Sequence, residues 1–347
     1  MNIFDLPELR LDGLNALTDE VGMLQHSKFS IIERQKGYTT DDNTRALISA
    51  LRYNQVYKKT ESIELIKKYL TFLLHMQNKD GSFSNFLEYD RTVKEKVGSE
   101  ECMGRVLWAC GTMLASKINE DMRQVAKEIF DKGLPFSRVF TSPRARAYTL
   151  LGLKGYHVAY PSDSNIHKNS KMHSNFLVNL FTVNSEEDWK WFEPYLTYAN
   201  ARISHALFSA YALNGDDNSL EIAVESLEFL IKTQLIEGVF IPVGSNGWYM
   251  KNAKKAIYDQ QPIEASCTIE ALIEAYNTTK KQEYLEYALD CFKWYHGANI
   301  KGVELFDLHT STCFDGITPK GLNRNQGAES TLSYYMAYLV LKINKIL

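Results

Sequence analysis

The sequence predicts an all-α protein in which six apolar helices form an inner ring inside an outer ring of amphipathic helices. Two observations support this prediction. An apolar helix with a polar N-terminus recurs six times along the 347 residues, and helices with one charged face alternate with these apolar ones. A helix that is apolar all round must be covered on every side, whereas an amphipathic helix keeps one face in water. Each repeat is then a helical hairpin that cannot bury its own apolar face alone. Six such hairpins could close into a ring or extend as an open solenoid, and we expect the closed ring.

The first inner helix shows the pattern most clearly. It opens with Gly37-Tyr-Thr-Thr-Asp-Asp-Asn-Thr-Arg-Ala-Leu47, which places Asp41 and Asp42 where the helix should begin and Arg45 one turn later. Asp and Asn are favoured N-caps because their side chains accept hydrogen bonds from the free N–H groups of the first turn. The residues that follow are apolar enough to be buried. A polar opening before an apolar helix recurs at residues 100–110, 142–153, 198–211, 259–272 and 323–339.

The outer helices are predicted from their periodicity. Residues 61–74 carry apolar side chains at 63, 66, 70, 73 and 74, which is helical spacing with one charged face. The same type is expected at about 120–132, 166–181, 218–234 and 281–296, and a first helix is expected over residues 13–26. Long loops at 80–90, 237–249 and 302–316 lead to inner helices, and such loops on one face are usually functional. No low-complexity linker divides the chain, so we expect a single domain, residues 1–347.

Composition narrows the class of partner. The net charge is −3 without a long run of one sign, which argues against nucleic acid or an anionic membrane as a partner. Five cysteines form no C-x-x-C pair, so reduced core thiols are expected, with no metal and no cofactor. The first residues lack a basic segment followed by an apolar one, and no apolar run of about 18 residues occurs. We therefore expect a cytoplasmic protein.

Four motifs carry a resemblance to a known group of proteins. They occupy residues 37–47, 97–105, 259–265 and 323–332. They are similar to a bacterial group of six-hairpin (α/α)6-toroid glycosidase-like proteins, found beside or fused to glycosyltransferases and mannoside-processing enzymes. The resemblance covers about residues 14–339. It implies the (α/α)6 toroid, carbohydrate chemistry and a glycosyltransferase encoded nearby as a partner, but it assigns no catalytic pair. Glu100-Glu101 stands where the pattern of the relatives has Glu-Asp.

The polar openings supply the candidate catalytic acids. Glycoside hydrolysis needs two carboxyl groups that flank the scissile bond, one as acid and one as base or nucleophile. A helix N-terminus stabilises an ionised carboxylate, which suits a base, whereas a neighbouring like charge can raise the pKa of an acid. Capping of the helix is the alternative role for each of these side chains. The candidate catalytic residues are Asp41, Asp42, Glu100, Glu101, Asp259 and Glu329.

Further polar and aromatic side chains near the same openings are candidates for substrate binding. The arginines just inside the helices, Arg45, Arg105 and Arg202, are better explained as structural ion pairs with the acids. Arg144 and Arg324 could hold a phosphate, which would turn hydrolysis into phosphorolysis. His26 and His205 could move protons, with a structural role as the alternative for each. The candidate substrate-binding residues are Tyr38, Arg45, Arg144, Asn200, Trp248, Gln260, Asn323, Arg324, Asn325 and Gln326.

The sequence thus predicts a carbohydrate-active enzyme, a glycoside hydrolase that cleaves an oligosaccharide, with mannose as a candidate sugar. Two alternatives stay open. The first is a sugar epimerase or an unsaturated-uronide hydrolase on the same toroid, and a pair of histidines at the sugar would favour the epimerase. The second is a non-catalytic glycan-binding partner of a glycosyltransferase, which would bind a glycan without turnover.

Overall fold

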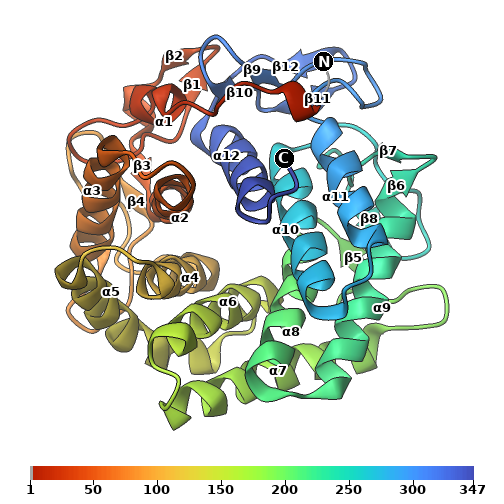
Figure 1. Ribbon diagram of the computed structural model, residues 1–347, viewed down its shortest axis with the longest axis horizontal. Coiled ribbons are helices and arrows are strands. Elements are labelled where there is room, and N and C mark those ends of the chain that lie inside the picture. The colour runs from red at the N-terminus through yellow and green to blue at the C-terminus, as the bar shows by residue number, and fades with distance from the viewer. Residues whose placement is uncertain (1–2) are drawn as a thin grey trace.

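The computed structural model describes residues 3–347 and shows two concentric rings of helices (Figure 1). The last inner helix packs against the first and against the one before it, so the ring is closed. The open solenoid is therefore excluded. The inner helices are α2 (Thr40–Tyr57), α4 (Glu100–Ala115), α6 (Pro143–Ala159), α8 (Ala201–Asn214), α10 (Pro262–Thr279) and α12 (Ala328–Ile343).

Five long helices form most of the outer ring, and each packs against an inner helix. Their bounds agree with the amphipathic segments that the sequence predicts. They are α3 (Thr60–Met76), α5 (Glu120–Gly133), α7 (Ser164–Asn184), α9 (Asp217–Gln234) and α11 (Glu283–Lys293). None of these helices, nor any other within residues 3–347, is both long and apolar enough to cross a membrane.

The sixth outer position differs from the prediction. The expected helix over residues 13–26 is only α1 (Asp12–Ala16), which packs against α12. The reason is local, because the Asp19 side chain accepts hydrogen bonds from the backbone N–H groups of Val21 (2.9 Å) and Gly22 (3.3 Å). Such a side-chain turn competes with the helical hydrogen-bond pattern. The chain then continues into the first of several short ribbons.

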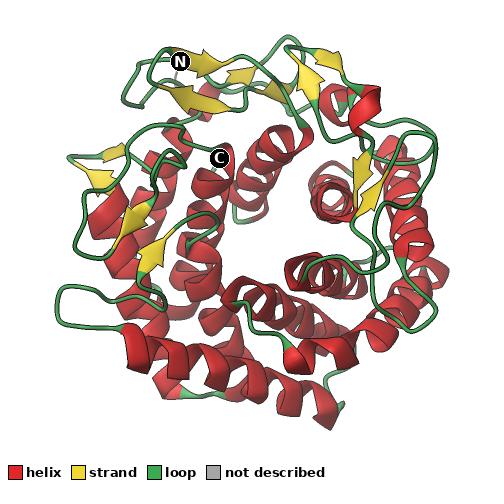
Figure 2. Ribbon diagram, turned by 180° about the vertical axis from the view of Figure 1, so that it is seen from behind, coloured by secondary structure: helices red, strands yellow, loops and turns green. Residues whose placement is uncertain are grey.

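Six two-stranded antiparallel ribbons lie in the connections outside the inner ring (Figure 2). Two of them flank the site described below. In the first, Thr39 pairs with Phe86, and in the second, Leu196 pairs with Tyr249. The ribbons pair β1 (Ser27–Lys28) with β2 (Ile31–Ile32), β3 (Tyr38–Thr39) with β4 (Phe86–Leu87), β5 (Tyr195–Leu196) with β8 (Tyr249–Met250), β6 (Leu235–Ile236) with β7 (Val239–Phe240), β9 (Phe306–Asp307) with β10 (Thr312–Cys313), and β11 (Gly316–Thr318) with β12 (Gly321–Asn323).

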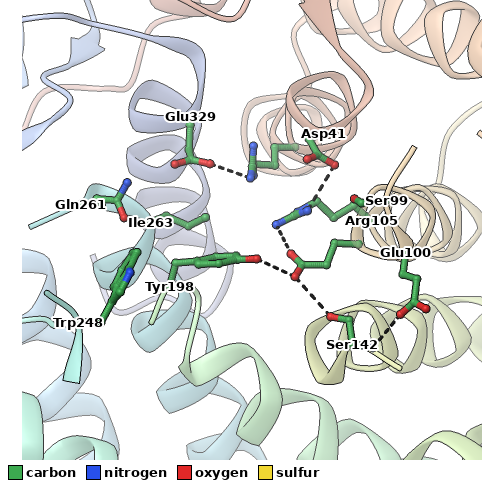
Figure 3. A pocket seen from close by; sticks show the side chains of 12 residues that line it. Asp41, Ser99, Glu100, Arg105, Ser142, Tyr198, Trp248, Gln261, Ile263 and Glu329 are labelled. Atoms are coloured by element: carbon green, nitrogen blue, oxygen red, sulfur yellow. Dashed lines mark hydrogen bonds and ion pairs between the residues drawn. The ribbon is translucent and has the colours of Figure 1, made fainter. Parts of the chain in front are cut away.

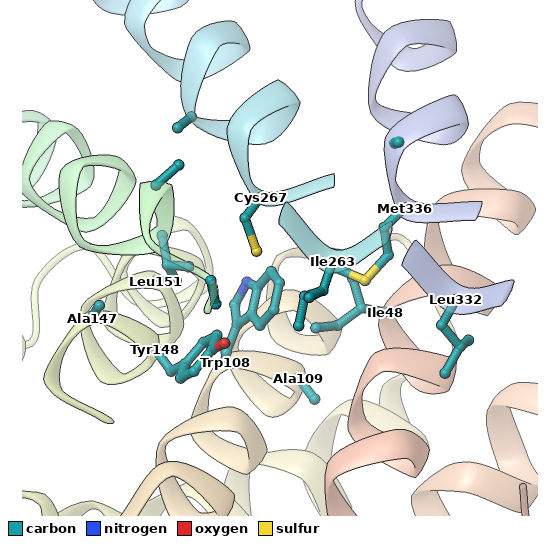
Figure 4. Close-up of a cluster of buried hydrophobic side chains, with 14 of the residues drawn as sticks. Ile48, Trp108, Ala109, Ala147, Tyr148, Leu151, Ile263, Cys267, Leu332 and Met336 are labelled. Atoms are coloured by element: carbon teal, nitrogen blue, oxygen red, sulfur yellow. The ribbon is translucent and has the colours of Figure 1, made fainter. Parts of the chain in front are cut away.

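The centre of the inner ring is a packed core. Ile48, Trp108, Tyr148, Cys267 and Met336 come from five different inner helices and are all buried there (Figure 4). All five cysteines of the chain are free and buried, as expected. This core fixes the inner helices relative to one another, and therefore also fixes the positions of their N-termini.

Candidate active site at the N-terminal rim

The N-terminal ends of the inner helices surround one pocket of about 600 Å³, which we call the rim pocket (Figure 3). Five of the inner helices contribute a side chain from their first turns or from the residue just before them, and Tyr198 contributes from the turn that precedes α8. This convergence follows from the parallel inner helices, which place all six polar openings on one rim. The lining residues are Asp41, Arg45, Ser99, Glu100, Glu101, Arg105, Ser142, Tyr198, Trp248, Gln261, Ile263 and Glu329.

Hydroxyl side chains, not the acids, cap the first three inner helices. The Thr39 hydroxyl accepts a hydrogen bond from the Asp42 N–H (3.0 Å), the Ser99 hydroxyl from the Cys102 N–H (3.1 Å), and the Ser142 hydroxyl from the Ala145 N–H (3.3 Å). These caps satisfy N–H groups that the acids would otherwise take. Capping is therefore not the role of the carboxylates at the starts of α2 and α4.

Two buried arginines join acids from neighbouring helices. Arg105 of α4 lies 3.1 Å from the Glu101 carboxylate and 3.4 Å from the Asp41 carboxylate of α2. Arg45 of α2 lies 2.9 Å from Glu329 of α12 and 2.9 Å from Asp42. The pocket lining holds four acids and two arginines, which gives it a formal net charge of −2. The ion pairs thus bind the acids together without neutralising the pocket.

The two acids at the start of α4 have different surroundings. Glu101 accepts hydrogen bonds from the Tyr198 hydroxyl (2.8 Å), the Ser142 hydroxyl (3.4 Å) and Arg105 (3.1 Å). Glu100 instead accepts from the backbone N–H groups of Thr141 and Ser142, both at 2.7 Å. Glu101 is thereby fixed by donors from three segments inside the pocket, whereas the carboxylate of Glu100 ties α4 to the start of α6.

Asp42 and Asp259, both predicted as catalytic acids, do not line the rim pocket. The Asp42 carboxylate is buried and accepts hydrogen bonds from the Thr39 hydroxyl (2.6 Å) and from Arg45 (2.9 Å). Burial raises the pKa of Asp42 above its ordinary value, although Arg45 opposes this shift. Asp259 lies in a turn with φ +57° whose backbone carbonyl accepts from Ser245. We therefore assign Asp42 to the support of Arg45 and leave Asp259 outside the site.

Of the predicted substrate-binding residues, Arg45 and Trp248 line the rim pocket. Three others have their polar groups engaged in hydrogen bonds or an ion pair inside the protein. The Tyr38 hydroxyl donates to Asp19 (2.6 Å), and the Gln260 amide accepts from the Trp294 ring N–H (2.8 Å) and donates to the Ile257 carbonyl (2.9 Å). Arg144 forms a buried ion pair with Glu193 (2.8 Å). Because their polar groups already have partners, these three side chains do not reach the pocket.

The predicted polar cluster before α12 closes the ring instead of lining the pocket. The Asn325 amide oxygen accepts from the Phe29 N–H (3.0 Å), and the Gln326 N–H donates to the Ser27 hydroxyl (2.8 Å). Asn323 and Arg324 are exposed outside the pocket. This segment therefore joins the last inner helix to the β1–β2 hairpin near the N-terminus.

Other side chains enter the site without having been predicted for it. Tyr198 was noted only as part of a helix opening, and Arg105 only as a structural cation. Gln261 and Ile263 reach the pocket from the start of α10. None of the eight histidines, all within residues 3–347, lines the pocket. His205 is buried 3.0 Å from Arg202, and burial together with Arg202 holds the pKa of His205 well below its ordinary value.

Comparison with known proteins extends the description of the fold. No protein-family model and no curated protein sequence matches the chain. Among solved structures, cellobiose 2-epimerase from Bacillus thermoamylovorans B4167 matches with a TM-score of 0.75 at 11% identity, over 97% of this chain and 96% of that one. The fold is the (α/α)6 toroid. It is the six-hairpin architecture that the sequence motifs implied.

Two other solved toroids match over similar lengths. A D-mannose isomerase has a TM-score of 0.70 at 12% identity, over 97% of this chain and 96% of that one. An inactive variant of the α-1,6-mannanase GH76A of Salegentibacter sp. HEL1_6, in complex with α-1,6-mannotetrose, has a TM-score of 0.69 at 13% identity, over 96% and 97%. These likenesses concern the fold of this chain, and its chemistry has to be argued from the rim pocket.

Proposed function

We propose that this protein is a glycoside hydrolase that cleaves a neutral oligosaccharide in the rim pocket. One observation carries the proposal. Asp41, Glu101 and Glu329 reach the same pocket from three different inner helices, and ion pairs hold each of them. Glycoside hydrolysis requires carboxyl groups on both sides of the scissile bond, so acids from separate helices suit it better than adjacent acids on one helix.

The surroundings of the three acids suggest different roles. Glu101 is held in one orientation by three donors, which suits the group that activates water or attacks the anomeric carbon. Glu329 is the most exposed of the three, with 42% of its side chain accessible and Arg45 as its ion-pair partner. Asp41 is less exposed, at 22%. We assign the proton donor to one of these two acids, Asp41 or Glu329.

A pair of aromatic rings provides a surface for a sugar. Tyr198 and Trp248 lie on one side of the pocket, opposite Asp41 and Glu100 (Figure 3). Their ring centroids are 6.3 Å apart. Trp248 has φ +57°, a conformation that bulky residues rarely adopt, and such strain concentrates at functional sites. The flat faces of these rings can pack against the C–H face of a sugar ring.

The charge of the pocket favours a neutral substrate over an anionic one. With a net charge of −2, the lining would repel a uronide or a sugar phosphate. Arg144 and Arg324, the candidate phosphate ligands, lie outside the pocket. We therefore prefer hydrolysis to phosphorolysis, and prefer a neutral saccharide to the uronide of the alternative prediction.

One observation favours hydrolysis over epimerisation, although epimerases are among the similar toroids. The epimerase alternative called for a pair of histidines at the sugar, and no histidine within residues 3–347 lines the pocket. One of the similar toroids is an α-1,6-mannanase, and the inactive variant of that enzyme was solved in complex with α-1,6-mannotetrose. α-1,6-Linked manno-oligosaccharides are therefore the first substrates to test.

The test is a product assay on manno-, gluco- and galacto-oligosaccharides, with and without phosphate, followed by NMR of the anomeric protons. We expect cleavage that does not depend on phosphate. Glu101→Gln should abolish it, and Asp259→Asn is the matched control, because Asp259 is also a rim acid but lies outside the pocket. Asn also tolerates the left-handed backbone at this position. Formation of a 2-epimer of unchanged mass would overturn the proposal. Tight binding of a saccharide without cleavage would also overturn it, in favour of the non-catalytic glycan-binding protein.

Aryl glycosides would separate the roles of the acids. A good leaving group needs no proton, so the variant of the proton donor should recover most of its activity on a dinitrophenyl glycoside. We expect this recovery for either Asp41→Asn or Glu329→Gln, and not for Glu101→Gln. Recovery of Glu101→Gln alone would exchange the roles assigned here.

A further inference from the structure

The turn that carries Tyr198 into the rim pocket is held from behind by buried polar groups that do not line the pocket. We propose that Glu264 is a positioning residue, which fixes the turn at residues 197–200 and so keeps the Tyr198 hydroxyl on Glu101. This inference rests on the proposed function only in its consequence for turnover. The contacts behind the turn can be tested without any substrate.

The turn has an unusual backbone. Ala199 has φ +48°, which places a residue with a Cβ atom in the left-handed region. Such conformations are uncommon and persist only where the surroundings enforce them. Tyr198, immediately before it, is 36% exposed, and its hydroxyl donates to the Glu101 carboxylate at 2.8 Å. The placement of this hydroxyl therefore depends on whatever holds the turn.

Glu264 provides the first of these restraints. It lies in the first turn of α10 and is only 1% exposed. One of its carboxylate oxygens accepts from the Ala199 N–H, and the other accepts from the Asn200 side-chain amide at 2.9 Å. Asn200 in turn accepts from the Thr197 N–H (2.9 Å) and donates to the Thr197 carbonyl (2.8 Å). Both oxygens of Glu264 are thus committed to the turn.

Arg144 provides the second restraint. Its guanidinium donates to the Tyr198 carbonyl at 2.7 Å and to the Thr197 hydroxyl at 2.9 Å, and it lies 4.9 Å from the centre of the Tyr198 ring. Glu193 holds the guanidinium from the other side at 2.8 Å. Arg144 and Asn200, which the sequence suggested as substrate ligands, therefore reach the site indirectly, through Tyr198.

Replacing Glu264 by Gln should disturb this arrangement without removing bulk. The Ala199 N–H and the Asn200 amide donate to different oxygens of Glu264. A Gln side chain has an NH2 group in place of one of these oxygens, so one of the two donors would lose its acceptor. The turn can then relax from its unusual backbone conformation, and the Tyr198 hydroxyl moves away from Glu101. Small displacements of positioning groups lower the rate of the chemical step more than they weaken binding. We therefore expect Glu264→Gln to lower kcat roughly 10- to 100-fold with little change in KM.

A double-mutant cycle with Tyr198→Phe tests whether Glu264 acts through Tyr198. Glu264→Gln should lower kcat in the wild-type background and have little further effect in the Tyr198→Phe background. A full effect in both backgrounds would overturn the proposal. Glu270→Gln is the matched control, because Glu270 is another buried acid of α10, but its carboxylate pairs with Arg52 and Arg202 and makes no hydrogen bond to residues 197–200. Its effect on kcat should be equal in both backgrounds.

Amide hydrogen exchange tests the same inference without turnover. In Glu264→Gln, the Thr197 and Ala199 amides, which donate to Asn200 and Glu264, should exchange faster than in the wild type, whereas Glu270→Gln should leave them unchanged. Unchanged exchange in Glu264→Gln would reject the inference, whatever sugar the enzyme cleaves. If that variant does not fold, Asn200→Ala removes one of the two donors to Glu264 and should produce the same faster exchange. If exchange changes but no saccharide is ever cleaved, the positioning role stands and the proposed function fails.

Discussion

The two adjacent acid pairs at the rim, Asp41–Asp42 and Glu100–Glu101, look alike in the sequence but behave differently in the structure. The second acid of α4, Glu101, shares Arg105 with the first acid of α2, Asp41. The other two carboxylates have structural roles. Asp42 forms an ion pair with Arg45, and Glu100 accepts hydrogen bonds from the backbone N–H groups just before α6. Consecutive residues of a helix point about 100° apart, so neighbours rarely share one target. The acids that work together therefore come from different helices.

The largest expected effect separates the acid at the centre of the rim pocket from its neighbour in the chain. Glu101→Gln should lower kcat by a factor of about 1,000 or more, because it removes the group assigned to water activation or attack. Glu100→Gln should cost about tenfold or less, because that carboxylate bonds to backbone N–H groups. Steady-state kinetics on a cleaved oligosaccharide measures both values. Equal losses of kcat in the two variants would show that Glu101 and Glu100 do not have the different roles assigned to them.

Asp42→Asn should act on stability more than on turnover. The substitution removes the buried charge that pairs with Arg45 and leaves that arginine with Glu329. We expect unfolding to become easier by roughly 2–3 kcal/mol, because a partly unpaired buried guanidinium is costly. Denaturant unfolding measures this change, with Glu100→Gln as the comparison. A variant with wild-type stability and no turnover would instead make Asp42 a catalytic residue.

Glu264 differs from the paired acids of the pocket, because burial has a larger effect on its pKa than the nearby charge of Arg144 has. Burial raises the pKa of Glu264 from its ordinary value of 4.5 to about 7. The folded protein therefore holds this proton more tightly than the unfolded chain does, so this residue's contribution to stability is lost as the pH rises from about 4.5 to about 7. The loss should amount to about 3 kcal/mol. Unfolding measured at pH 5 and pH 8 should show it, and Glu264→Gln should flatten the difference. If the pH dependence of unfolding is unchanged in this variant, titratable groups other than Glu264 cause it.

The smallest expected effect separates binding from chemistry in the pocket. Trp248→Ala should raise KM roughly 5- to 30-fold with a lesser change in kcat, equivalent to about 1–2 kcal/mol of lost contact with the sugar. Stability should change little, because the substitution also removes a bulky side chain from a position with φ +57°. Trp248→Gly, which suits this backbone conformation, should be at least as stable. Steady-state kinetics and thermal unfolding measure these effects, and an unchanged KM would remove Trp248 from the substrate site.

Much of the fold could be predicted, because apolar and amphipathic helical segments alternate along the whole chain. The two sets of helices and the gathering of polar N-termini at one rim follow from that contrast, whereas closure of the ring was expected from the resemblance to six-hairpin toroids. The helix expected over residues 13–26 was too long because hydrophobic spacing continues past Ala16, whereas the Asp19 side chain already forms a turn.

The site could be predicted only in part. A polar residue near a helix start can point into the pocket, as Glu101 does, or into a neighbouring connection, as Asn325 does, and the sequence does not record the difference. Tyr198 was missed because its position depends on the left-handed backbone at Ala199. That conformation is imposed by Glu264, which is 65 residues away in the chain.

The most direct measurement is a crystal structure of Glu101→Gln with α-1,6-mannotetraose. We predict that the saccharide crosses the rim pocket, with one sugar ring against Trp248 and a glycosidic oxygen within hydrogen-bond distance of Asp41 or Glu329. The residue at position 101 should face the anomeric carbon of the same linkage. A saccharide bound elsewhere on the molecule, or one in the pocket whose linkages approach none of these acids, would show that the rim pocket is not the site of hydrolysis.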